Sequence, residues 1–208
     1  MNQVSLPKHS VRFTRALLLT AAIAAPTFTM SASNAAGAPD AGIMKGSGRL
    51  HAWMEIASVH SGKALSTLHN AADTANKGNQ EPIIQYDYYG DATQKWRLES
   101  NGDGTWVIKI AQGGRALCTL HNAADPANKG NQEPIIQYDY YGDSTQKWRI
   151  EPNSDGTWII KNVHSGKALS LLHNAADPAN KGNQEPLIQY DYYGDATQKW
   201  RIVVVGLD

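Results

Sequence analysis

Cysteine is nearly absent from this chain: Cys118 is the only one in 208 residues. A chain with a single thiol forms no internal disulfide, so its stability must come from packing. The residues 52 positions before and after Cys118 are Ser66 and Ser170, so the thiol belongs to no repeated feature. Two interpretations stay open, namely a buried thiol and an intermolecular disulfide.

An excess of charge of either sign is also absent, because 19 basic residues balance 19 acidic ones. The composition therefore predicts no basic face for nucleic acid. The longest apolar stretch, "ALLLTAAIAA", is shorter than the roughly 20 residues that a membrane-spanning helix requires. Beyond this stretch, no segment has apolar residues at i, i+3, i+4 and i+7 over the length of a helix.

The first 38 residues have the composition of a secretory signal peptide. Lys8, Arg12 and Arg15 precede the apolar stretch, and small residues follow it at "SNA" and "AGA". We expect cleavage near residues 35–38, by general secretion because no arginine pair is present. The prediction is a secreted, extracellular protein without a membrane span, with 16 basic and 19 acidic residues. The alternative is a leader that stays attached.

What the chain does contain is one unit repeated three times. The segment "IQYDYYGDATQKWR" at 84–97 returns at 188–201, and at 136–149 with one Ser for Ala. Residues Gln94, Gln146 and Gln198 are 52 apart, and a period in this range indicates a repeat architecture. We predict a short linker at 39–50 and one domain at 51–208, with repeats of about 51–102, 103–154 and 155–208.

Each repeat has the signals of four short strands separated by turns. In the middle copy the strands are "WVIKIA", "RALCTL", "PIIQYDY" and "KWRIE", and the turn clusters include "NAADPANKGN" and "NSDG". One such unit is too small to bury its apolar face, so three must close on one another as a capped barrel or a three-bladed propeller. Propellers usually have four to eight blades. The prediction is an all-β fold, a β-trefoil of three ~52-residue four-stranded repeats with pseudo-threefold symmetry.

The three copies differ unevenly along their length. Residues 68–97 and 120–149 differ at two of 30 positions, whereas 98–119 and 150–171 differ at 11 of 22. The nearly identical part consists mostly of polar loops, and loops normally vary. Three loops kept alike indicate three copies of one working surface; patchy gene conversion is the alternative.

The repeated surface has the chemistry of a saccharide site. A tyrosine ring offers a flat apolar face for the C–H side of a pyranose, and carboxylates and amides bind hydroxyl groups. The segment "QYDYYGD" supplies Tyr86, Tyr88 and Tyr89. We favour Tyr86 as the platform, while Tyr88 and Tyr89 could instead cover the rim of the barrel.

The triplets Gln94-Lys95-Trp96, Gln146-Lys147-Trp148 and Gln198-Lys199-Trp200 resemble those of the ricin-type β-trefoil lectin family, across the whole chain after the leader. We expect the three tryptophans in the core and the glutamines hydrogen-bonded to the neighbouring loop. The resemblance implies glycan partners, galactose-type sugars among them, and no cofactor. It places the aromatic platform and a glutamine contact at these positions: Tyr86, Tyr138, Tyr190, Gln94, Gln146 and Gln198.

The chain departs from the family's pattern at two polar positions. The family's usual asparagine is replaced by Thr93, Thr145 and Thr197, which we retain as candidate contacts. The sugar-binding aspartate of the family is replaced by Ser66, Cys118 and Ser170. Our hypothesis is that the long loop that follows supplies the missing acid, together with a histidine. These candidates are Asp73, Asp125, Asp177, His69, His121 and His173.

Together these features predict a secreted carbohydrate-binding protein with up to three equivalent shallow sites, which binds polymeric or clustered glycans by avidity. A trefoil that binds protein, such as a protease inhibitor or an adhesin, is the alternative. The three histidines could instead meet as a metal site, although loops of this kind usually lie away from the axis. We expect no enzyme, because a catalytic set is normally single and asymmetric.

Overall fold

A computed structural model describes residues 52–67, 78–119, 129–171 and 181–207 of the chain. The proposed acid and histidine positions in the long loops, and the predicted leader, lie outside the described residues. None of the described segments forms a helix long and apolar enough to cross a membrane.

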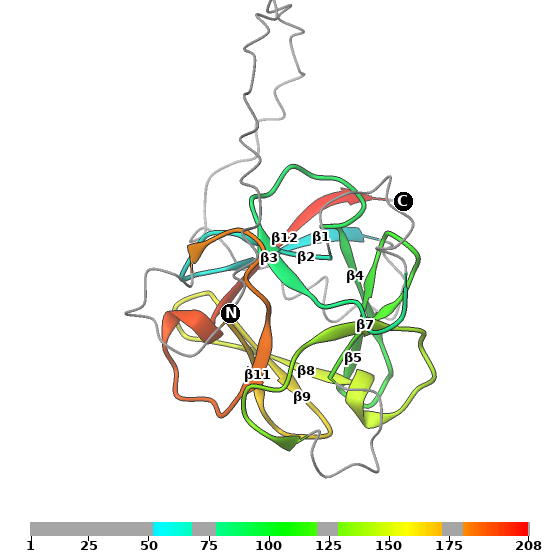
Figure 1. The fold of residues 1–208 in the computed structure, drawn as a ribbon. Coiled ribbons are helices and arrows are strands. Elements are labelled where there is room, and N and C mark those ends of the chain that lie inside the picture. The colour runs from blue at the N-terminus through cyan, green and yellow to red at the C-terminus, as the bar shows by residue number, and fades with distance from the viewer. Residues whose placement is uncertain (1–51, 68–77, 120–128, 172–180, 208) are drawn as a thin grey trace, which may run out of the picture. The chain divides into compact units, whose positions relative to one another are not determined.

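Twelve short strands make up one antiparallel sheet, four from each repeat (Figure 1). The first repeat contributes β1 (Ala52–Ser58), β2 (Ala64–Ser66), β3 (Ile84–Tyr86) and β4 (Trp96–Ser100). The second contributes β5 (Trp106–Ile110), β6 (Ala116–Cys118), β7 (Ile136–Tyr138) and β8 (Trp148–Pro152). The third contributes β9 (Trp158–Asn162), β10 (Ala168–Ser170), β11 (Ile188–Tyr190) and β12 (Trp200–Leu207).

The first and fourth strands of the repeats close into a six-stranded barrel. Its pairings run β1–β4, β4–β5, β5–β8, β8–β9, β9–β12 and β12–β1, so the ring has no open edge. The second and third strands form three hairpins, β2–β3, β6–β7 and β10–β11. A closed barrel with three hairpins in threefold repetition is a β-trefoil, which confirms the predicted fold class.

The barrel pairs more extensively between repeats than within them. Strands β4 and β5 share five residue pairs from Trp96↔Ile110 to Ser100↔Trp106, whereas β1 and β4 share only Met54↔Trp96. A single repeat therefore leaves most hydrogen-bonding groups of its barrel strands unmatched. Because unpaired strand edges are unfavourable, the sequence must supply all three copies.

The core is assembled from the same positions of each repeat. The tryptophans of the three triplets are fully buried, as predicted, and pack with Ile56, Ile108 and Ile160. Each indole occupies the volume of a large apolar side chain while its N–H meets a backbone carbonyl, which is how a buried tryptophan is usually accommodated. The core thus repeats with the period of the sequence.

A ring of three backbone hydrogen bonds joins the repeats where they meet. The N–H of Ile83 donates to Ile135 O (2.9 Å), Ile135 to Leu187 (3.0 Å) and Leu187 back to Ile83 (2.8 Å). All three side chains are fully buried. The chain enters these segments through Gln80, Gln132 and Gln184, each with φ of 68°, a conformation that is uncommon for residues other than glycine. The same backbone path is thus kept in all three copies.

Two 3-10 helices, η3 (Ser144–Gln146) and η5 (Ala196–Gln198), are the only helical elements with assigned bounds in the described part of the chain. Each follows an aspartate, Asp143 or Asp195, whose carboxylate accepts a hydrogen bond from the backbone N–H two residues on. An aspartate at this position satisfies a donor that has no partner in the helix itself. These turns lead directly into β8 and β12.

Candidate functional site

Each repeat presents two tyrosine rings in the same arrangement. The rings of Tyr86 and Tyr89 meet edge to face, with centroids 5.8 Å apart and an interplanar angle of 87°. The other two pairs have separations of 5.7 and 5.8 Å and angles of 83° and 84°; they are Tyr138–Tyr141 and Tyr190–Tyr193. Edge-to-face contact is a favoured geometry for aromatic pairs. The pair is therefore a fixed feature of the fold, made three times.

The two rings of a pair differ in exposure. The predicted platforms Tyr86, Tyr138 and Tyr190 are partly buried at the end of β3, β7 and β11. The second ring is the more open one, 48% exposed in Tyr89 and 47% in both Tyr141 and Tyr193. A ligand that approaches the loop therefore meets the second tyrosine at least as readily as the predicted platform.

The glutamine of each triplet holds the loop that carries the tyrosines. Gln94 Oε1 accepts hydrogen bonds from the backbone N–H groups of Tyr89 (2.9 Å) and Gly90 (3.3 Å). Its Nε2 donates to the carbonyl of Asp87 (2.8 Å). Gln146 and Gln198 make the same three bonds, within 0.1 Å, in their own repeats. This confirms the expected local hydrogen bonding of the glutamines.

The threonine before each glutamine stabilises the same loop through the aspartate two residues earlier in the chain. The hydroxyl of Thr93 donates to Asp91 Oδ1 (2.5 Å), which also accepts from the Thr93 backbone N–H (2.8 Å). The predicted threonine and glutamine contacts are all fully buried: Thr93, Thr145, Thr197, Gln94, Gln146 and Gln198. In this conformation a sugar has no access to these side chains, so their direct contact with a ligand would require the tyrosine loop to move.

The second tyrosine covers the positions where the resemblance places the polar contacts of the family. The hydroxyl of Tyr141 hydrogen-bonds with Thr145 and Cys118, and its pKa is raised to about 12, chiefly by desolvation. Tyr89 and Tyr193 hydrogen-bond with Thr93 and Thr197, and desolvation also raises the pKa of each. The hydroxyl group of each of these tyrosines thus contacts a fully buried threonine, while about half of the residue stays exposed.

Cys118 is a fully buried thiol. Its Sγ lies 3.4 Å from Thr145 Oγ1, and burial raises its pKa to about 12. Ser66 and Ser170 instead donate to the carbonyls of Thr67 and Leu171, both at 2.6 Å. The interpretation of Cys118 as a buried thiol is confirmed. The second repeat therefore has a thiol where the other two repeats have a serine hydroxyl group.

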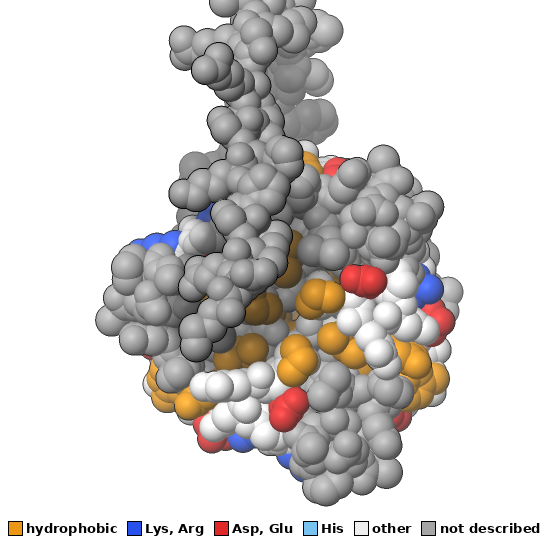
Figure 2. Space-filling view, viewed as in Figure 1, with side chains coloured by type: hydrophobic (Ala, Val, Ile, Leu, Met, Phe, Trp, Pro, Cys, Tyr) orange, Lys and Arg blue, Asp and Glu red, His pale blue; other side chains and the backbone are white. Residues whose placement is uncertain are grey.

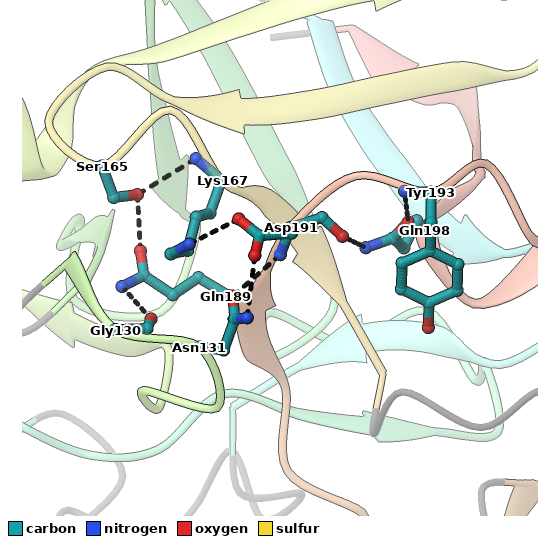
Figure 3. Close-up of polar contacts among 8 residues, drawn as sticks. All are labelled: Gly130, Asn131, Ser165, Lys167, Gln189, Asp191, Tyr193 and Gln198. Carbon is teal, nitrogen blue, oxygen red and sulfur yellow. Dashed lines mark hydrogen bonds and ion pairs between the residues drawn. The ribbon is translucent and has the colours of Figure 1, made fainter.

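On the other side of the loop, each site contains a polar cluster that joins two repeats. In the third repeat, Asp191 Oδ1 accepts from Lys167 Nζ (2.5 Å) and Asp191 Oδ2 accepts from Asn131 Nδ2 (2.9 Å). Figure 3 shows Lys167 and Asn131 on one side of Asp191, and Gln198 and Tyr193 on the other. Asn131 belongs to the second repeat. Hydrogen bonds from Lys167 and Asn131 lower the pKa of Asp191.

A third set of tyrosines lies apart from the pairs. Tyr140 and Tyr192 are 41% and 38% exposed, and the Nζ atoms of Lys109 and Lys161 lie 4.9 and 5.2 Å from their ring centroids. These lysines are on β5 and β9, so the rings cover the outer wall of the barrel. We call these two residues and Tyr88, the residue at the equivalent position of the first repeat, the outer tyrosines.

Sequence reasoning placed Asp87 and its equivalents on the repeated polar surface, but it missed the asparagine and the basic residue of the inter-repeat cluster. The missed residues are Asn79, Asn131, Asn183, Lys63, Arg115 and Lys167. A signal was present, because the "NKGNQEP" and "QYD" stretches are identical in all copies. Their mutual contact could not be read from that identity.

Among the described residues, no group of three or more metal-ligating side chains is assembled. The histidines of the metal alternative, His69, His121 and His173, lie outside the described residues. The same holds for Asp73, Asp125 and Asp177.

The space-filling view in Figure 2 shows hydrophobic side chains gathered near the centre of the face that is turned to the viewer in Figure 1, with acidic and basic side chains around them.

The profile of the family described as "Ricin-type beta-trefoil lectin domain-like" matches residues 49–138, 118–181 and 144–208. These overlapping matches span all three repeats. Among curated protein sequences, none matches the chain.

Several solved structures share the fold. The designed threefold-symmetric protein ThreeFoil is 34% identical, with a TM-score of 0.64 over 74% of this chain and 99% of that one. The exo-β-1,3-galactanase 1,3Gal43A of Clostridium thermocellum is 26% identical, with a TM-score of 0.60 over 74% of this chain and 30% of the enzyme. The C-half of an earthworm R-type lectin, solved with GalNAc, is 17% identical, with a TM-score of 0.54 over 74% and 99%.

Proposed function

Because this chain belongs to the family of ricin-type β-trefoil lectin-like domains, we propose that it is a carbohydrate-binding protein with up to three glycan sites. The observation that carries this proposal is the tyrosine pair, with an exposed ring held by the same bonds in each repeat. A rigid ring loses little conformational freedom on binding. Its face suits the apolar side of a pyranose, while neighbouring carboxylates and amides suit its hydroxyl groups.

Within each site we assign stacking to the tyrosine pair and a supporting role to the buried threonine and glutamine. In the first repeat these residues are Tyr86, Tyr89, Thr93 and Gln94, and the equivalent residues of the other repeats have the same roles. The long loop remains our candidate for the acid and histidine that bind sugar hydroxyl groups. Changing Asp73, Asp125 and Asp177 together to Ala should abolish glycan binding; unchanged binding would refute this part of the proposal.

Three shallow sites on one chain favour a polymeric or clustered ligand. Linking sites raises the effective concentration of the second contact and increases avidity by roughly 10²–10⁴ when the geometry permits. We therefore propose a preference for polysaccharides over free sugars. Galactose-type sugars are the first to test, because the relatives include a galactanase and a lectin solved with GalNAc.

We also propose that the chain is exported and cleaved near residues 35–38, and that it binds rather than converts its ligand. Mass spectrometry of the protein recovered from the culture medium tests the cleavage. A mature mass that includes the first 38 residues would contradict it.

Glycan arrays and polysaccharide pull-down test the binding itself. The triple substitution of Tyr86, Tyr138 and Tyr190 by Ala should abolish the signal. The matched control replaces the three outer tyrosines by Ala, which removes the same number of rings from the same segments. Loss of binding in the control alone, or one-to-one binding to a protein without any glycan signal, would overturn the proposal.

A further inference from the structure

The loop of each repeat reaches into the site of the next one. Asn183 of the third repeat accepts a hydrogen bond from the backbone N–H of Asp87 (2.9 Å) and donates to its Oδ2 (2.9 Å). Lys63 Nζ lies 2.5 Å from the other carboxylate oxygen. We call this group of an asparagine, an aspartate and a basic residue the repeat latch.

The repeat latch recurs around the whole molecule. Asn79 of the first repeat makes the same two bonds to Asp139 of the second, at 2.8 and 3.0 Å. Asn131 of the second makes them to Asp191 of the third, both at 2.9 Å. The direction is therefore cyclic, from each repeat to the following one and from the third back to the first. In the second repeat the basic residue is Arg115, which bonds to both Asn79 (2.8 Å) and Asp139 (3.1 Å).

The latched aspartate lies inside the tyrosine loop. Asp87 directly follows Tyr86, and its carbonyl accepts the bond from Gln94, which also holds Tyr89. The peptide segment between the two tyrosines is thus fixed from both sides: by Gln94 of its own repeat and by Asn183 of the preceding one. A change at either anchor is therefore expected to alter the position of the two tyrosine rings.

Docking of the repeats has other hydrogen bonds besides those of the latch. Gln85 Nε2 donates to Gly182 O (2.9 Å), and the Gln85 backbone bonds to Gln184 and Glu185 (both 2.9 Å). The carboxylates of the latch are 65–67% exposed, and exposed ion pairs contribute little to stability. The effect of the latch therefore falls mainly on the position of the Asp87 backbone, whose N–H it binds.

We propose that Asn79, Asn131 and Asn183 are positioning residues, each for the tyrosine pair of the following repeat, so that every glycan site is built by two repeats. This inference rests on the proposed function. It assigns the first site to residues 86–97 together with the 181–186 segment of the third repeat. The sites are then a closed set of three interdependent units.

Single-site proteins test the assignment. Replacing Tyr138 and Tyr190 by Ala leaves only the first site, and the three asparagines are then changed to Ala one at a time. Titration calorimetry with a galactose-terminated oligosaccharide should show about fivefold or greater weakening for Asn183→Ala, and a clearly smaller change for Asn79→Ala and Asn131→Ala. In a protein that keeps only the second site, Asn79→Ala should have the largest effect. Each substitution removes the two bonds to an aspartate, so each is the stability control for the others, and Asn79→Ala also removes the bond from Arg115.

A second readout needs no ligand. In ¹⁵N-labelled protein, Asn183→Ala should shift the amide resonances of Asp87, Tyr89 and Gly90, while Asn79→Ala shifts those of Asp139, Tyr141 and Gly142. Equal weakening by all three substitutions, or unshifted tyrosine-loop amides, would overturn the proposal. If the oligosaccharide does not bind the unmodified protein, the proposed sugar specificity is wrong. The amide shifts then still test whether each asparagine positions the tyrosine loop of the following repeat.

Discussion

The indole nitrogen of Trp96 donates a hydrogen bond of 2.9 Å to the carbonyl of Leu65. The bond joins barrel strand β4 to hairpin strand β2 of the same repeat, and both residues are fully buried. Trp148 and Trp200 make the same bond to Leu117 (2.9 Å) and Leu169 (3.1 Å). The tryptophan of the triplet therefore fastens the hairpin to the barrel as well as filling the core.

Replacing Trp96 with Phe should lower the free energy of unfolding by about 2–4 kcal/mol, because it removes ring volume and leaves the Leu65 carbonyl without its donor. Urea denaturation measures the change. Trp53→Phe is the control, since Trp53 is only partly buried and lies beside Arg97 at the surface. Equal losses in the two variants would contradict the fastening role of Trp96.

Replacing Gln94 with Ala should both destabilise the protein and loosen the first tyrosine pair. The change leaves two N–H groups and one carbonyl of the loop without partners, which costs about 1–3 kcal/mol. The amide resonances of Tyr89 and Gly90 should shift or broaden, while those of the other two loops stay in place. Lys95→Ala serves as the control. An unperturbed tyrosine loop in the Gln94 variant would show that the glutamine does not hold it.

Cys118 should be inert towards thiol reagents in the native protein. Burial denies access and raises the thiol pKa to about 12, so the reactive thiolate is scarce at neutral pH. Iodoacetamide at pH 8 should label it only after unfolding in denaturant. Rapid labelling of the native chain would contradict the burial of the thiol.

The repeat latch should survive mild acid and fail only at low pH. Hydrogen bonds from Lys63 and Asn183 lower the pKa of Asp87, and equivalent bonds lower that of Asp191. A lowered carboxylate pKa stabilises the fold above the unfolded value of about 3.9, and this contribution is lost as the pH falls through the folded value. Titrating the side-chain ¹³C resonances of both aspartates from pH 6 to 2 should give midpoints below that value. Midpoints at or above it would contradict the bonding.

Much of the fold could be predicted from the repetition in the sequence. Three equally spaced Gln-x-Trp triplets and four strand signals per copy indicated three units that must close together, and the structure has that closure. The buried role of Trp96, Trp148 and Trp200 followed from their apolar surroundings. Periodicity works here because each repeat contributes equivalent residues to one core.

The composition of the site was predicted less completely than the fold. Tyr86 and its equivalents were predicted as the platforms and the more exposed Tyr89 was given a lesser role, because a sequence does not show which of two neighbouring rings faces solvent. Thr93 and Gln94 were expected to contact sugar, whereas the structure buries them under the tyrosine loop. The resemblance to the family gave the positions of these residues in the chain but did not show that the tyrosine loop covers them.

By itself the sequence determined the period, the strands and the identity of the residues repeated three times, since these depend on local patterns and on the need to bury apolar surface. Only the tertiary structure decided that Asn183 meets Asp87, 96 residues away in the chain. That contact depends on the closure of the barrel, which brings the last repeat beside the first. The local sequence determined which residues make up each candidate site, whereas closure of the barrel determined which two repeats supply them.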